Sequence, residues 1–195
     1  MRGGIMKKYF FFFFIAISLI FLSQSVFANN TQSEKKFSFE VGAGIRSISN
    51  DLYKDVYDSP GTVISFDFGY RVVKQVEIFA HTDYFKKDGK LTLTEEDTTL
   101  KLIPIEFGVR YLFNVGKTGR IVPYIGLGGG FYSIKETNVI GDFNESKAGF
   151  LLEGGIKFYI VKSFFLDLKL KDVILKYEDT KLGGSVVLGG IGISF

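Results

Sequence analysis

The sequence of 195 residues contains no cysteine and no tryptophan, only three prolines, and a single histidine, His81. The absence of cysteine excludes disulfide bonds, thiolate metal sites and a lipid-anchored cysteine near the amino terminus. Beyond residue 36 the sequence also lacks any sustained 3.6-residue apolar period, which an amphipathic helix would show. These absences leave a chain without covalent cross-links whose ordered part is not helical.

The first 28 residues have the three parts of a secretory signal peptide. Arg2, Lys7 and Lys8 form a basic start, an apolar run covers residues 9–22, and a polar stretch ends on the small residue Ala28. The alternative is a permanent membrane helix, but the apolar run is shorter than the roughly 20 residues that a span requires. We predict that residues 1–28 are a signal peptide cleaved after Ala28, that residues 29–36 are a short disordered lead-in, and that the chain is exported.

The charge of the remaining chain is balanced. Three of the 24 Lys and Arg residues lie in residues 1–28 and none of the 21 Asp and Glu residues do, which leaves 21 of each sign from residue 29 onward. A nucleic-acid-binding surface needs clustered excess positive charge. We therefore expect no nucleic-acid partner, and a single domain over residues 37–195.

Apolar and small or polar residues alternate with a period of two in eight separate segments, which is typical of β-strands with two different faces. The segments are residues 37–46, 64–72, 76–84, 103–113, 124–132, 150–160, 164–171 and 185–195. Long polar links follow alternate strands, at residues 50–61, 86–97 and 135–147, and the turns at residues 73–75 and 161–163 are short. Short turns at one end and long loops at the other are typical of outer-membrane barrels, in which the short turns are periplasmic.

Two architectures could explain this pattern. A soluble sandwich or lipocalin-like barrel would place the apolar face inside and the other face in water. Here the second face carries glycines and charges, a poor coat for solvent but suitable for a tight polar lumen. The apolar stripes also end in aromatic residues, as two interfacial girdles would. These are Tyr70, Tyr111, Phe113, Phe158, Phe164 and Phe195 at the periplasmic side, and Tyr84 and Phe131 at the outer side. We therefore predict an all-β fold, an eight-stranded antiparallel up-and-down transmembrane β-barrel.

Two segments and the last strand resemble a known family. Residues 103–113 and 122–132 look like the fourth and fifth strands of the outer-membrane β-barrel domain family, the small OmpA- and OmpX-like proteins. Gly190, Ile193 and Phe195 resemble the signal that the outer-membrane assembly machinery reads in that family, although Leu188 stands where a polar residue is usual. The resemblance covers residues 37–195. It implies a monomer in the outer membrane of a Gram-negative-type bacterium, with the lipid bilayer and the assembly machinery as partners.

The inward faces of the predicted strands carry many charges. Assigned by parity, these are Glu40, Arg46, Asp67, Arg71, Glu77, Asp83, Glu106, Arg110, Glu153, Lys157, Asp167, Lys169 and Lys171. An eight-stranded barrel is just wide enough to be filled by side chains, so these charges must pair or be hydrated. So many carboxylates could serve acid–base catalysis or a proton path, but we favour a structural ion-pair network that closes the lumen.

Inward glycines and the one histidine complete the candidate features. Gly126, Gly128 and Gly130 do not form a dinucleotide loop because no helix follows, and we expect them to make room for long inward side chains. His81 faces inward two residues before Asp83, which does not match the lipid-facing His and Ser of lipid A hydrolases in similar barrels. We predict no catalytic, cofactor or metal site.

Three functions remain open. We favour a structural or surface-interaction role, similar to an adhesin, through the links at 50–61, 86–97 and 135–147, which could meet an unknown extracellular ligand. The first alternative is a small pore or a conduit for hydrophobic solutes. A lipid A-modifying enzyme is the second, and fold alone does not decide between the three.

Overall fold

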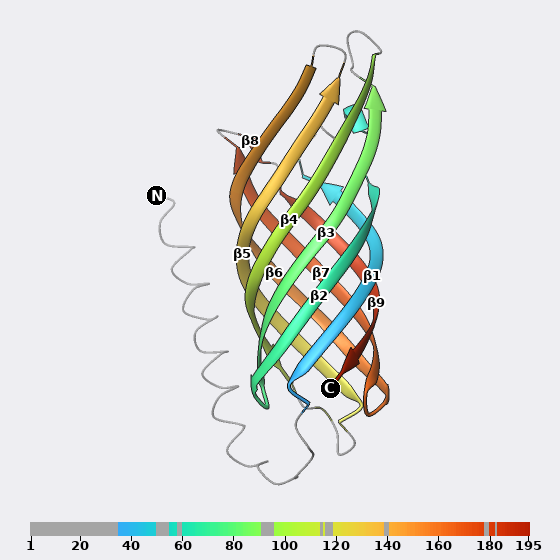
Figure 1. Ribbon diagram of the computed structural model, residues 1–195, viewed down its shortest axis with the longest axis vertical. Coiled ribbons are helices and arrows are strands. Elements are labelled where there is room, and N and C mark those ends of the chain that lie inside the picture. Colours follow the sequence, from blue (N-terminus) through green and yellow to red (C-terminus); the bar gives the residue numbers. More distant parts are fainter. Residues whose placement is uncertain are drawn as a thin grey trace, which may run out of the picture. The chain divides into compact units, whose positions relative to one another are not determined.

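The computed structural model describes residues 35–49, 55–57, 60–90, 96–113, 115, 119–138, 141–177, 180–181 and 183–195. The predicted signal peptide and most of the lead-in lie outside these residues. The described chain is almost entirely β-strand (Figure 1). The strands are β1 (Phe37–Ile48), β2 (Gly61–Val73), β3 (Val76–Lys90), β4 (Asp97–Leu112), β5 (Ile121–Asn138), β6 (Gly141–Val161), β7 (Phe164–Tyr177), β8 (Thr180–Lys181) and β9 (Gly184–Ser194). Among the described residues, no helix has the length and hydropathy to cross a membrane.

The sheet closes on itself. Each long strand pairs antiparallel with the next along the chain, and β1 pairs with β9 through Val41 opposite Ile191. The two-residue β8 pairs only with the end of β7 and adds no spanning strand. The predicted fold, an eight-stranded antiparallel up-and-down barrel, is confirmed. We call the end where β1 begins and β9 finishes the terminal end, and the opposite end the hairpin end (Figure 1).

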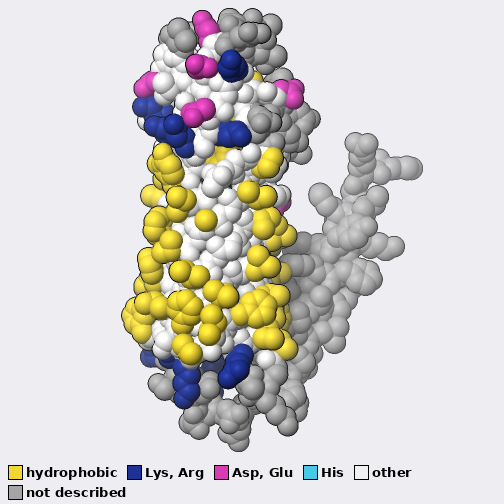
Figure 2. Space-filling model, turned by 90° about the vertical axis from the view of Figure 1, so that its right-hand side faces the viewer, with side chains coloured by type: hydrophobic (Ala, Val, Ile, Leu, Met, Phe, Trp, Pro, Cys, Tyr) yellow, Lys and Arg dark blue, Asp and Glu magenta, His cyan; other side chains and the backbone are white. Residues whose placement is uncertain are grey.

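The barrel has its apolar side chains on the outside. Phe107 is 56% exposed, whereas Glu106 and Arg110, one and three residues away on the same strand, are fully buried. Successive side chains of a strand point to opposite faces, so the two classes separate into an apolar exterior and a charged lumen. Figure 2 shows the resulting apolar band on one face of the barrel, with basic side chains below it and charges of both signs above, and exposed apolar side chains occur on every long strand.

Aromatic rings gather at the terminal end of the apolar band. The ring of Phe37 lies 5.0 Å from that of Tyr70 and 5.9 Å from that of Phe195. The rings of Tyr111 and Phe113 are also 5.0 Å apart, in an edge-to-face arrangement. Phenol and phenyl rings at one level suit the interface between hydrocarbon and water.

Four strands run further than the sequence indicated. Most of the predicted link 135–147 is strand, since only two residues separate β5 from β6, and half of the predicted link 86–97 is strand, since β3 continues to Lys90 and β4 begins at Asp97. The prediction of a long loop at residues 135–147 is therefore wrong, and the link predicted at 86–97 is shortened to the six residues between β3 and β4. In the link 50–61, residues 55–57 form a helical turn and Gly61 already belongs to β2.

These strand ends resemble loops in the sequence because the medium outside the barrel changes along each strand. Lys101 is half-buried and faces outward, while Leu100 and Leu102 point inward and are buried. The period of two therefore persists, but its polarity is inverted relative to the apolar band, because at this level water replaces lipid outside the barrel. Polar outward positions made these strand ends resemble loops.

Candidate functional site

The lumen of the barrel holds a set of buried ionisable side chains, which we call the lumen plug. They come from β1, β2, β3, β4, β6 and β7, whereas the corresponding positions of β5 and β9 are largely glycine. The members of the lumen plug are Glu40, Arg46, Asp67, Glu77, His81, Asp83, Glu106, Arg110, Glu153, Lys157, Asp167, Lys169 and Lys171.

Arg110 is the centre of the terminal half of the plug. Its guanidinium donates to Asp67 with an Nη1–Oδ1 distance of 2.8 Å, to Glu77 at 3.2 Å, and to Glu153. The same group lies 4.2 Å from the ring centroid of Phe79, a favourable place for a cation. Lys157 shares Glu77, at 2.9 Å. One arginine thus joins carboxylates from three strands, and the planar fork of its donors makes that possible.

Lys169 extends the network across the lumen. Its ammonium lies 3.0 Å from Asp67, 3.4 Å from Glu40 and 3.8 Å from Asp167. The Tyr124 hydroxyl donates to Asp167 at 2.8 Å. Each of these buried carboxylates therefore has a donor, which a buried charge requires.

A second group lies nearer the hairpin end. Lys171 donates to Asp83 at 2.6 Å and to Glu106 at 2.7 Å, and Arg46 donates to Asp83 at 2.9 Å. The Tyr132 hydroxyl also donates to Glu106, at 2.7 Å. This group closes the lumen directly above the Arg110 cluster.

His81 connects the two groups. Its Nδ1 lies 3.0 Å from Asp67 and its Nε2 lies 2.7 Å from Asp83. The sequence predicts no role for His81, whereas the side-chain positions show that it bridges carboxylates of β2 and β3.

The alternation of strand residues predicts that Arg71 belongs to the ion-pair network, but Arg71 is not a member of the lumen plug. Its side chain is half-buried at the terminal end of β2, beside the irregular pairing between Arg71 and Val73, and it makes no ion pair with a described residue. The plug therefore contains seven carboxylates against five lysine and arginine side chains, with His81 as a thirteenth member. Because carboxyl groups outnumber the basic side chains, several carboxyl groups share one cation, as Asp67, Glu77 and Glu153 share Arg110.

Three plug residues could in principle offer ligands to a metal ion. Ligand atoms of His81, Asp83 and Glu106 all lie within 4.8 Å of one another. The ammonium of Lys171 contacts both carboxylates at the distances given above and supplies the positive charge that a metal would bring. The arrangement therefore fits an ion-pair network better than a metal site.

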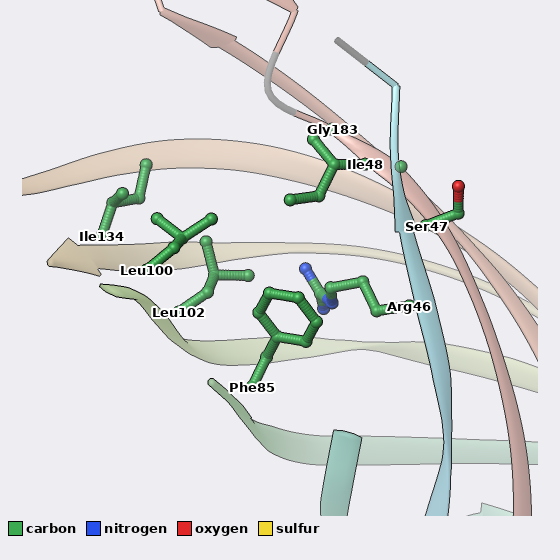
Figure 3. Close-up of a pocket in the computed structure, with 9 residues that line it drawn as sticks. Arg46, Ser47, Ile48, Phe85, Leu100, Leu102, Ile134 and Gly183 are labelled. Carbon is green, nitrogen blue, oxygen red and sulfur yellow. The ribbon is translucent and has the colours of Figure 1, made fainter. Parts of the chain in front are cut away.

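Above the plug lies a layer that the sequence reading missed, which we call the outer apolar layer. Its inward side chains are buried against one another, and Figure 3 shows Phe85, Leu100, Leu102 and Ile134 lining one cavity together with Arg46. The layer comprises Ile48, Tyr57, Val63, Phe85, Leu100, Leu102, Ile134, Leu151, Val173, Leu175, Val186 and Leu188. A cavity of about 20 Å³ remains there, the room of about one water molecule. Extending the period of two through the polar links would have located this layer.

Inward glycines provide space for plug side chains. A Cβ on Gly126 would meet Arg110 and Glu153, one on Gly190 would meet Glu40, and one on Gly192 would meet the ring of Phe165. A Cβ on Gly128 would instead meet the backbone of β4, with Gly108 Cα at 3.0 Å. Gly126 thus makes room for long inward side chains, as predicted, whereas Gly128 permits the close approach of two strands.

The last strand is held to the first at its extreme end. Phe37 and Phe195 exchange two backbone hydrogen bonds of 3.0 Å. Ile193 and Phe195 point outward and are exposed, while Gly190 faces the lumen. The three residues of the predicted assembly signal therefore lie on the closing strand, two of them on its outer face.

Comparisons with known proteins agree with this architecture. A family model described as outer membrane protein beta-barrel domain matches residues 14–195. No curated protein matches the sequence. Among solved structures, Neisserial surface protein A is similar with a TM-score of 0.63 at 18% identity, over 82% of this chain and 97% of that one.

Two further structures have the same fold. Ail, the attachment invasion locus protein of Yersinia pestis, solved in complex with the heparin analogue sucrose octasulfate, has a TM-score of 0.60 at 18% identity, over 83% of this chain and 99% of its own. The outer membrane protein OprG from Pseudomonas aeruginosa has a TM-score of 0.60 at 15% identity, over 85% and 99%.

Proposed function

The chain belongs to the outer membrane protein beta-barrel domain family, and from this premise we propose that it is a sealed, monomeric surface-interaction barrel. The terminal end faces the periplasm, the apolar band lies in the outer membrane, and the hairpin end projects outward to bind an extracellular ligand. Catalysis and transport form no part of this role.

The filled lumen supports a role without transport. A solute on the barrel axis would have to displace the outer apolar layer, with its cavity of about 20 Å³, and then the lumen plug. Disrupting buried ion pairs such as Lys171–Glu106 leaves charges unpaired, at a cost of several kcal/mol.

The observation that carries the proposal is the construction of the β5–β6 hairpin. Beyond the apolar band its outward face is polar, and ion pairs such as Lys135–Asp142, at 2.9 Å, cross its surface. Phe143 lies near the tip on the other face of the hairpin, opposite Glu136, and is 47% exposed. An exposed aromatic ring on a paired, polar hairpin is the kind of anchor that protein and carbohydrate interfaces use.

The β3–β4 hairpin is held firmly enough to present a second surface. Gly89 packs against the helical turn at Val56 and Tyr57, and the Tyr57 hydroxyl lies 3.1 Å from Thr98 Oγ1. A surface ordered before binding loses less entropy when its ligand arrives.

The first ligand class to test is sulfated carbohydrate, because Ail, a barrel of the same fold, was solved with a heparin analogue. We would display the protein on bacteria and measure their attachment to immobilised heparin and to epithelial monolayers. The main variant removes residues 136–143 and joins Lys135 to Asn144, which are register partners, through an Asn-Gly turn. Attachment should fall to the level of cells without the protein.

Point variants distinguish the contribution of the Phe143 ring to attachment from that of the rest of the hairpin. Phe143→Ser should reduce attachment, whereas Asn144→Ser, a neighbouring exposed position, should leave it unchanged. Attachment that survives hairpin removal, or dye efflux from liposomes that contain the purified barrel, would refute the proposal.

A further inference from the structure

Strand β6 continues beyond the end of its pairing with β7. It pairs with β7 as far as Gly149 opposite Leu175, but with β5 as far as Gly141 opposite Asn138. Past Leu175, β7 pairs with the short β8. Figure 1 shows strands β3 to β6 rising beyond the rest of the barrel at the hairpin end. Residues 141–148 of β6 therefore have β5 on one side and no described strand on the other.

The hydrogen bonds of the ladder identify which backbone groups of β6 face away from β5. The amide of Tyr159 donates to the carbonyl oxygen of Arg120 on the β5 side, at 2.8 Å. In an antiparallel pair every second residue of a strand bonds to a given neighbour, so the odd-numbered residues of β6 bond to β5. The even-numbered residues point their N–H and C=O groups to the other side. We call this row the β6 edge, and it consists of Asp142, Asn144, Ser146 and Ala148.

The β6 edge lies beyond the apolar band, where water surrounds the strand. Phe150, which is 73% exposed, is the last large apolar residue on the outward face of β6 before the edge. Residues 142–148 span about 20 Å of strand, at about 3.3 Å per residue. The segment contains no proline and pairs with β5 without a bulge, although natural sheets use both devices to block an edge. Its backbone is therefore regular enough to pair with a further strand.

The opposite flank of the same four strands has neighbours. There the residues that lead into β2 contact β3, since Lys87 Nζ lies 3.4 Å from the Pro60 carbonyl oxygen and Gly89 packs against the helical turn at Val56. No strand in the described part of the chain pairs with the β6 edge. The protein thus contacts one flank with its own chain and leaves the backbone groups of the other to water.

We propose that the β6 edge binds an extended segment of a partner protein as an additional β-strand. A polypeptide backbone repeats its N–H and C=O groups at the spacing of the edge, whereas a sugar or a lipid headgroup does not. The side chains of the added strand alternate, so that one set lies beside Phe143 and the other beside Asn144 and Ser146. This inference rests on the proposed function, because it requires the hairpin end to face outward, and it names a polypeptide ligand for the same hairpin.

The probe is a library of phage-displayed random peptides of about twelve residues, long enough to cover the edge, selected on the full barrel in lipid nanodiscs. Asn144→Pro is the main variant, because it removes an N–H from the β6 edge and none from the ladder with β5, and proline is tolerated on edge strands. Ser146→Pro is a second variant of the same kind. Asn144→Ser keeps the N–H and is the matched control. Boiled and unboiled gel samples verify that all three variants are folded.

Peptides selected on the unaltered barrel should bind both proline variants about tenfold more weakly, because each proline removes a backbone hydrogen bond and its ring obstructs the approaching strand. The affinity for Asn144→Ser should stay within about twofold of the original, since the backbone donor remains. A selection that yields no binding peptide would overturn the proposal, as would equal affinity for the proline variants and the control.

Amide hydrogen exchange followed by NMR tests the same point at single residues. In the free barrel the amides of the β6 edge should exchange faster than those of Phe143 and Glu145, which bond to β5. A bound peptide should slow the exchange of the edge amides. If they are slowed at high barrel concentration without peptide, the proposal is overturned in favour of pairing between two copies of the chain.

Attachment to heparin, measured in the same variants, separates this proposal from the proposed function. Nanodiscs expose both ends of the barrel, so peptide binding there does not depend on how the protein is oriented in a cell. Asn144→Pro should leave heparin attachment unchanged while it weakens peptide binding. If attachment survives removal of the hairpin but peptides still require the β6 edge, the sulfated ligand is refuted and strand addition is supported.

Discussion

Arg110 of β4 and Asp67 of β2 meet across the lumen, with Arg110 Nη1 2.8 Å from Asp67 Oδ1, although β3 separates their strands in the sheet. The ladder hydrogen bonds of a barrel join only neighbouring strands. Contacts such as this one add links between strands that the ladder does not connect.

Replacing Arg110 should destabilise the barrel strongly. Arg110→Ala leaves Asp67, Glu77 and Glu153 without their shared cation, and loss of one partner from a buried ion network costs about 3–5 kcal/mol. Urea unfolding of the protein in lipid vesicles measures this cost. Arg71→Ala is the control, and since Arg71 pairs with no described residue it should cost less than about 1 kcal/mol. An Arg110→Ala protein with unchanged stability and leaky vesicles would show that the plug is a gate and not a structural element.

Two glycines of β9 should respond differently to the same added methyl group. Gly192→Ala brings a Cβ against the ring of Phe165, whereas Gly189 faces outward with nothing within 4 Å of its Cβ position. We expect Gly192→Ala to lower the free energy of unfolding by about 1–3 kcal/mol and Gly189→Ala to leave it nearly unchanged. Refolding into detergent followed by urea titration gives both values. Combining Gly192→Ala with Phe165→Leu should recover part of the loss, and a lack of recovery would mean that the ring is not the obstacle.

The outer apolar layer should contribute to stability as a soluble core does. Leu102→Ala removes a buried side chain from that layer and should cost about 2–5 kcal/mol. Ser133→Ala changes an exposed position of similar height and should have little effect. Faster cleavage of the hairpin end by added protease should accompany Leu102→Ala. Equal stability of the two variants would contradict the assignment of a packed layer.

Phe195 is expected to act in assembly more than in stability. Phe195→Ala removes one ring contact, to Phe37, while the backbone bonds of the closing strand remain. In cells the amount of barrel in the outer-membrane fraction should fall severalfold, whereas refolding of purified protein should be close to normal. Phe158→Ala, at an exposed aromatic position of β6, is the control. An equal fall with both variants would indicate a general need for interfacial aromatics and no specific signal.

Much of the fold could be read from local pattern. The backbone of a strand places successive side chains on opposite faces whatever its neighbours are. For that reason Val41 could be placed outside and Glu106 inside without knowledge of the tertiary structure. The closing contact of β1 with β9 followed from the even number of strands.

The candidate site was less accessible from the sequence. Parity assigned Arg71 and Arg110 to the same lumen, but only Arg110 joins the network, because Arg71 lies at the terminal rim of the barrel. His81 was given no role, although it bridges two carboxylates. Which ion-pair partners meet across a lumen depends on the stagger of the strands and on the reach of long side chains. The two-residue alternation of apolar and polar residues predicts neither of these.

The sequence by itself determined that this chain alternates, which residues share a face, and that the faces suit a barrel in a membrane, because a strand's two-residue period is a property of the backbone. The tertiary structure alone decided which charges meet and where along each strand the polarity inverts. Both depend on height along the barrel axis, which sets whether lipid or water surrounds the wall and which side chains lie at one level.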